Sequence, residues 1–242
     1  MPGWPSTHQY QATVPVRSHT ARVVDDLGLA IVSGRRPEGT LLPGDGELIE
    51  RYGVSRTVLR EALKTLSAKG LVQAKARIGT RVRDRAQWNL FDPDVLIWHA
   101  RIGFTPEFLR HLGEMRMALE PEAAALAAQR WTAAQLAGIE DWIEQMSDPD
   151  ILPQDFVRAD IGLHLAIAAA AGNPFFLSIS TLIEVVVVAM LTISSPLESP
   201  KRLAASVAEH KRVADAIRLQ DSTGARRAMR AVIRKGIDQL RN

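Results

Sequence analysis

The sequence has 242 residues, of which 46% are hydrophobic and 24% are charged, which excludes a disordered or low-complexity chain and leaves room for two modest domains or one large one. The absence of cysteine excludes disulfides, thiolate metal sites and cysteine nucleophiles, and it fits a cytoplasmic location. A formal net charge of +3 by itself says little about nucleic acid.

Helical patterns dominate the first part of the chain. Residues 1–17 lack the charged-then-apolar pattern of a signal peptide and predict a flexible tail. Apolar residues at helical spacing predict a helix over 23–31. Two further helices are predicted over 45–52 and 55–69, the first closed by a glycine that suits a left-handed turn and the second capped by a serine. Two short helices joined by such a turn are typical of a helix-turn-helix.

The hydrophobic period changes directly after the second of these helices. Residues 71–74 and 80–83 read as two strands around a hairpin tip at 75–79 that carries two cations. A hairpin in this place is a wing. The sequence therefore predicts a winged helix-turn-helix DNA-binding domain over residues 18–85.

Basic side chains are concentrated in this domain. Residues 54–86 contain nine basic and two acidic side chains, a local charge of +7, so the remaining residues carry −4 of the total. A basic segment on a near-neutral remainder is typical of phosphate binding. The helix face opposite the apolar stripe presents five candidate DNA contacts, which are Ser55, Arg56, Thr57, Arg60 and Lys64. An ordinary amphipathic helix with solvated cations is the alternative.

The segment from Leu42-Pro43 to the wing closely resembles the DNA-binding domain of the GntR family of bacterial regulators. The resemblance rests on Gly53 to Thr57, Arg60 to Leu63, Gly70 to Val72 and Gly79-Thr80. It implies that Ser55, Arg56, Thr57 and Arg60 contact DNA, with Ala76 and Arg77 at the wing tip. Family members carry a DNA-reading arginine where this chain has Gly46, so the resemblance implies that one base contact is absent.

The rest of the chain is predicted to be helical. Residues 86–103 are taken as an aromatic, apolar interdomain linker that packs between the domains. From residue 104 an all-helical antiparallel bundle is expected, with caps at Thr132, Ser199 and Asp221. Its helices are predicted over 106–130, 132–147, 153–171, 174–195, 200–219 and 222–241. The apolar run 179–193 is too short to span a bilayer, contains Glu184 and predicts a buried helix, so no membrane partner is expected.

This second part, residues 104–242, resembles the FadR-type effector-binding and dimerisation domain of the same family, called FCD. The resemblance rests on Glu114 to Arg116, Leu119 to Pro121, Asp160 to His164, Gly172 to Pro174 and Glu209-His210. It implies a small-acid effector and, in many members, a divalent metal such as Zn or Ni held by an aspartate and three histidines.

The metal and effector residues can be assigned on this sequence. Asp160 and His164 lie one turn apart on one helix face, and His210 can join them from a facing helix. The family's fourth ligand position is Val232, so a hydrogen-bonded buried pair or a metal-free effector site remain as alternatives. Arg116 is the candidate partner of an effector carboxylate, with an ion pair to Glu120 as its alternative.

Together these features predict a transcriptional regulator, of the repressor type, that binds a palindromic operator as a homodimer. Its effector is predicted to be a small carboxylate, a sugar acid or related organic acid, bound by Arg116, Asp160, His164 and His210. Two alternatives from other classes are a metal-dependent hydrolase that uses the Asp160, His164 and His210 cluster, and a non-specific architectural DNA binder. Because no nucleophile elbow, phosphate loop or obvious general base accompanies that cluster, no enzymatic activity is expected.

Overall fold

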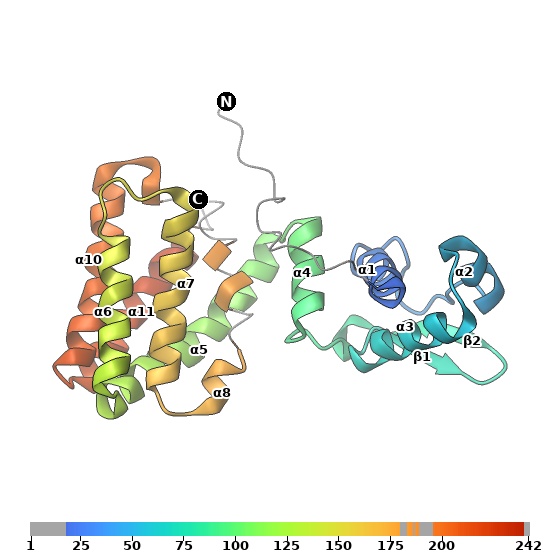
Figure 1. Cartoon of the computed structure of the whole chain (residues 1–242), viewed down its shortest axis with the longest axis horizontal. Helices are drawn as coiled ribbons and strands as arrows, with labels where there is room; N and C mark the ends of the chain where they lie inside the picture. Colours follow the sequence, from blue (N-terminus) through green and yellow to red (C-terminus); the bar gives the residue numbers. More distant parts are fainter. Residues whose placement is uncertain (1–17, 180–182, 186, 189–195, 240–242) are drawn as a thin grey trace. The chain divides into compact units, whose positions relative to one another are not determined.

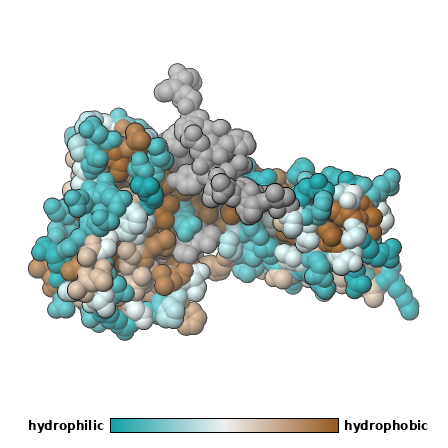
Figure 2. All heavy atoms as spheres, in the orientation of Figure 1, coloured by the Kyte–Doolittle hydropathy of each residue, from teal (hydrophilic) through white to brown (hydrophobic). Residues whose placement is uncertain are grey.

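The chain forms two compact units, Met1–Ile102 and Gly103–Asn242, in a computed structural model (Figure 1). The structure describes residues 18–179, 183–185, 187–188 and 196–239. The tail expected over residues 1–17 lies outside the described residues. Figure 2 shows that hydrophilic side chains cover much of the visible face of each unit, with hydrophobic patches between them.

The first unit contains the three helices predicted from the sequence. They are α1 (His19–Val32), α2 (Asp45–Tyr52) and α3 (Arg56–Ala68). Gly53 closes α2 with a positive φ of 61°, and the Ser55 hydroxyl accepts a hydrogen bond from the Val58 amide at the start of α3. Since both signals are local, the sequence located this turn correctly.

The wing is a two-stranded antiparallel hairpin formed by β1 (Val72–Lys75) and β2 (Gly79–Val82). Val72 pairs with Val82 and Lys75 pairs with Gly79. The first strand begins and ends one residue later than predicted, and the second begins and ends one residue earlier. Only Val72 and Val82 of these strands are buried.

Most of the segment expected to be a linker folds onto the first unit. After a short 3-10 turn, η2 (Arg85–Gln87), the chain forms α4 (Pro93–Ile102). On α4, Trp98 is buried and lies over Gly28 of α1, and its indole nitrogen donates to Asp25 at 2.9 Å. Lys69, at the end of α3, contacts Asp92 just before α4 at 2.8 Å. This helix was not predicted from the sequence, and its buried residues are Val95, Leu96 and Trp98.

The second unit is a bundle of antiparallel helices (Figure 1). The helices are α5 (Pro106–Arg130), α6 (Ala133–Met146), α7 (Pro153–Ala170), α10 (Pro200–Arg218) and α11 (Ser222–Gln239). The predicted caps are confirmed, since the side chains of Thr132, Ser199 and Asp221 each accept a backbone N–H at a helix start. The mainly α fold class, a winged helix-turn-helix followed by a helical bundle, is therefore confirmed.

One prediction in the bundle was wrong in its bounds. The helix expected over 174–195 is interrupted, because α8 (Pro174–Leu177) is followed by a turn at residues 178 and 179, where the Ser178 hydroxyl donates to the Pro174 carbonyl. Such side-chain bonds compete with the helical pattern. Residues 183–185 and 187–188 are helical, the remainder up to 195 lies outside the described residues, and η3 (Pro196–Glu198) precedes α10. Within the described residues no helix is long and apolar enough to cross a bilayer.

Candidate functional site

Helix α3 has one face in the core and one face in solvent. Leu59, Ala62 and Leu66 are fully buried beneath it. Arg56 and Arg60, one turn apart, are exposed on the other face, as the sequence predicts for a helix that enters a major groove. Thr57 and Ser55 are exposed beside them, and the Ser55 hydroxyl already caps the helix.

Lys64 lies one turn further along this exposed face. Its ammonium contacts Glu61 at 2.8 Å, and both side chains are more than half exposed. This pair offsets the positive charge of Lys64 locally. We therefore expect a smaller DNA contribution from Lys64 than from Arg56 and Arg60.

The wing tip presents Ala76, Arg77 and Ile78 to solvent. Arg77 has φ of 63°, a left-handed backbone conformation that residues other than glycine rarely adopt. Ile78 is 57% exposed, which is unusual for an isoleucine in a small domain. The sequence pattern placed Arg77 at the hairpin tip, and the resemblance gave it a DNA contact, but neither indicated the strain or the exposed Ile78. Gly46 on α2 is exposed and has open space where a side chain would project.

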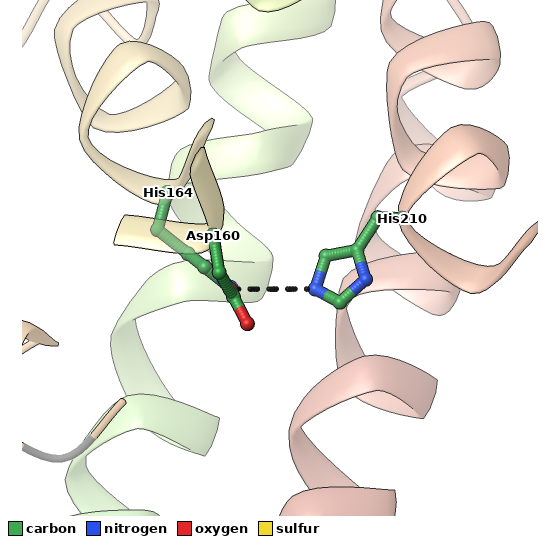
Figure 3. Close-up of side chains that lie close together, drawn as sticks. All are labelled: Asp160, His164 and His210. Atoms are coloured by element: carbon green, nitrogen blue, oxygen red, sulfur yellow. Dashed lines mark ion pairs between the residues drawn. The ribbon is translucent and has the colours of Figure 1, made fainter. Parts of the chain in front are cut away.

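The second unit brings three predicted ligand residues together in its interior. Asp160 and His164 project from α7 toward His210 on α10 (Figure 3). Asp160 Oδ1 lies 3.2 Å from His164 Nε2 and 3.6 Å from His210 Nε2. One ligand atom of each residue lies within 4.8 Å of the others, and all three residues are buried.

Arg116 and Glu120, one turn apart on α5, extend this cluster. The two side chains form a buried bidentate ion pair, which was the alternative considered for Arg116. An Arg116 terminal nitrogen also lies 3.4 Å from His164 Nε2, so the pair still reaches the three-residue cluster. Glu120 is a site residue that the sequence analysis named only as a possible partner.

Charges in this cluster shift the pKa values of its members. Burial favours the neutral forms, but Arg116 and His164 outweigh it and lower the pKa of Glu120 to about 2. Burial likewise opposes protonation of His164, but Glu120 and Asp160 raise its pKa to about 9. Burial lowers the pKa of His210, which leaves this imidazole neutral at pH 7. The site therefore contains both fixed charge and a neutral imidazole.

The cluster also contains unsatisfied polar atoms. Asp160 Oδ1, His164 Nδ1 and His210 Nε2 are buried and have no hydrogen-bond partner among the described residues. His164 Nδ1 nevertheless contacts a Glu120 oxygen at 2.5 Å as an ion pair, so Asp160 Oδ1 and His210 Nε2 are the atoms left without a hydrogen-bond partner in the part of the chain that the structure describes. Buried polar atoms without partners are rare and indicate a ligand, an ion or water.

These orphaned atoms fit a divalent metal. One carboxylate and two imidazoles are ligands that Zn²⁺ and Ni²⁺ accept. His210 Nδ1 lies 2.8 Å from the Ser206 carbonyl, and a ring N–H donated there leaves Nε2 free to bind an ion. Val232, at the family's fourth ligand position, lines the same cavity but offers no donor atom.

A cavity of about 420 Å³ opens beside the cluster. Arg116, Asp160, His164 and His210 all line it, so the structure brings the four predicted effector residues to one place. Its wall also contains polar residues that the sequence analysis missed, which are Lys201, Arg202, Ser206, Glu209 and Lys235. Only the spacing of Ser206 to His210 on one helix could have indicated any of them.

A winged helix-turn-helix followed by a helical bundle is the architecture of a class of transcription regulators. Residues 19–82 match the bacterial regulatory proteins of the gntR family, and residues 111–235 match the FCD domain. The chain therefore belongs to the GntR family and carries an FCD domain, which confirms the resemblance seen in the sequence. It is a regulator of transcription and not an enzyme.

Individual relatives support this assignment. The galactonate operon transcriptional repressor of Escherichia coli (strain K12) is 33% identical over 222 residues, which cover 92% of this chain and 96% of that protein. The uncharacterized HTH-type transcriptional regulator YieP of the same strain is 34% identical over 214 residues, covering 88% and 91% of the two chains.

Solved structures share the fold at lower identity. A Listeria monocytogenes structure described as Lar, which controls the agr system, has a TM-score of 0.59 at 19% identity and covers 92% of this chain and 96% of its own. Escherichia coli McbR/YncC has a TM-score of 0.51 at 21% identity, with 93% and 97% covered.

Proposed function

We propose that this protein is a repressor that binds a palindromic operator as a homodimer and responds to a small carboxylate, a sugar acid or related organic acid. The observation that carries the proposal is that one buried arginine and three buried ligand-type side chains face a single cavity. A guanidinium matches a carboxylate in a bidentate way. The names of two relatives support repression rather than activation. They are a galactonate operon transcriptional repressor and the repressor NanR of Citrobacter rodentium, which is 31% identical over 202 residues.

DNA reading is assigned to the exposed face of α3 and to the wing tip. Arg56 and Arg60 are the proposed base readers, with Ser55, Thr57 and Lys64 beside them and Ala76 and Arg77 at the wing. In a binding titration with DNA from the upstream region, Arg56→Ala and Arg60→Ala should each weaken specific binding by about 1–3 kcal/mol. Arg227→Ala, at an exposed position on α11, is the matched control and should leave binding unchanged. Silent Arg56 and Arg60 variants would overturn the assignment.

The homodimer follows from the symmetry of the proposed operator. Two half-sites about one helical turn of DNA apart require two copies of α3. Sedimentation should give a mass near twice 26.6 kDa, and each half-site of the protected DNA should carry the same sequence. A monomer at micromolar concentration bound to an asymmetric site would contradict this part of the proposal.

Effector binding is assigned to Arg116, Asp160, His164 and His210, with a divalent metal held by the last three. When bound, Zn²⁺ or Ni²⁺ would supply a Lewis acid that anchors the effector carboxylate. Arg116 would orient that carboxylate, and His210 would be held in its tautomer by the Ser206 carbonyl.

Thermal-shift measurements with D-galactonate and related acids, with and without EDTA, test this assignment. A ligand at about 100 times its Kd stabilises the folded state by about 2.7 kcal/mol. Asp160→Asn should abolish both the acid response and stoichiometric zinc binding. Asp155 is a partly exposed residue in the first turn of α7, and Asp155→Asn should change neither the acid response nor the zinc binding. If Asp160→Asn retains the full zinc content, the metal assignment is wrong.

A further inference from the structure

The effector cavity has two chemically different ends. Its inner end contains Arg116 and the Asp160, His164 and His210 cluster, all at most 6% exposed. Its wall also carries three outer cations. Lys201 and Arg202, in the first turn of α10, form the outer end, and Lys235 on α11 contacts Glu209, the residue before His210. Arg202 and His210 are eight residues apart on one helix, which is about 12 Å along the axis. A ligand that touches both ends must therefore be elongated.

The stability of helix α10 does not explain cations at its start. The first turn contains no acidic residue and two bases, although the positive end of a helix dipole disfavours cations. The cap is supplied by Ser199, whose hydroxyl accepts a hydrogen bond from the Arg202 amide. These cations destabilise the start of α10, and they line the cavity wall. Together the two observations indicate that the cavity binds an anion.

The outer cations can change partners easily. Lys235 contacts both carboxylate oxygens of Glu209 at 3.0 Å, and its side chain is 38% exposed. Arg202 pairs with Glu198, also at a partly exposed position. Lys201 forms no ion pair with the described residues. Because partly exposed pairs are weak, a ligand anion can replace them at little cost.

We infer that the effector of this protein carries a second anionic group, which is bound at the outer end by Lys201 and Arg202. This inference rests on the proposed function, in which the first carboxylate binds at Arg116 and the metal cluster. The second group is a carboxylate or a phosphate. Ser206 and Glu209, between the two ends, are placed to bind hydroxyl groups along the ligand. A cavity of about 420 Å³ suits a ligand of this size.

The test compares ligands that differ by one anionic group. Calorimetric titrations of the metal-loaded protein use D-galactonate against galactarate, and D-gluconate against D-gluconate 6-phosphate. In at least one pair the dianion should bind about tenfold more tightly than the monoanion. The pair that shows the larger difference identifies the second group as a carboxylate or a phosphate.

The variant Lys201→Gln locates the effect. It should weaken binding of the preferred dianion about fivefold and change binding of the matching monoanion by less than twofold. Lys211→Gln, exposed on the same helix and outside this cavity, should change neither. Because Lys201 is exposed, its replacement does not threaten folding.

Three results would overturn the inference. They are equal affinities within both ligand pairs, a Lys201→Gln effect that is the same for monoanion and dianion, and no Lys201→Gln effect at all. In these cases a monoanion that still binds leaves the proposed function intact. If none of the four acids binds, the proposed function fails together with this inference.

Discussion

The wing tip allows stability and DNA binding to be changed in opposite directions by one substitution. Arg77 has φ of 63°, and a left-handed conformation costs an L-residue with a side chain about 1–2 kcal/mol. Arg77→Gly removes this cost, but glycine also has more freedom in the unfolded chain. The net expectation is a gain of about 0.5–1 kcal/mol in the free energy of unfolding. The DNA contact proposed for Arg77 would account for a residue other than glycine at this position.

The proposed role of Arg77 is DNA contact, so the same substitution should weaken DNA binding. Loss of one cation in contact with the phosphates or the groove should lower specific affinity roughly tenfold, which is about 1.4 kcal/mol. It should also reduce the slope of log affinity against log salt by about 1. Fluorescence anisotropy at several salt concentrations measures both quantities, and urea unfolding measures stability. Arg77→Asn, which tolerates the left-handed conformation, should lose affinity in the same way.

A matched control exists in the other unit. Gln220 has φ of 58° in the turn between α10 and α11, where its amide and that of Asp221 close the helix on Ile217 and Ala216. Gln220→Gly should gain a similar stability and leave DNA binding unchanged. If Arg77→Gly keeps full affinity and salt dependence, Arg77 does not contact DNA. If it is destabilising while Gln220→Gly is stabilising, the strain argument for the wing is wrong.

Three further predictions concern the first unit. A Cβ added by Gly28→Ala would lie 2.2 Å from the buried Trp98 ring, so the free energy of unfolding measured in urea should fall by about 1–3 kcal/mol. An unchanged free energy of unfolding would contradict the packing of α4 on α1. Burial and the hydrogen bond to Asp26 raise the pKa of Tyr52 to about 12, so the folded state keeps a proton that the unfolded state loses above pH 10. The free energy of unfolding should therefore fall between pH 10 and pH 12, and Tyr52→Phe should remove this pH dependence; a fall that persists would point to another group. The side chain added by Gly46→Arg meets open space, so the variant should fold normally. Selection of bound DNA sequences should then give a changed base preference in each half-site. An identical preference would show that this position does not read DNA.

The sequence by itself determined the features that depend on neighbours within a few residues. The glycine at 53 and the serine at 55 predicted the turn between α2 and α3, because their φ preference and capping bond act over one helical turn. The same periodicity separated the buried Leu59 from the exposed Arg56 and Arg60. Spacing of four residues also placed Asp160 and His164 on one face of α7.

Contacts between distant segments were decided only by the tertiary structure. The presence of Lys201 and Lys235 on the wall of one cavity depends on how α10 and α11 pack, and no local pattern contains that information. The docking of α4 depends on a tryptophan that meets a glycine seventy residues earlier in the chain. Helical periodicity specifies which face of a helix is buried, whereas side-chain packing between helices selects the partner of that face. The exposed face of α3 was therefore predictable, and the full wall of the cavity in the second unit was not.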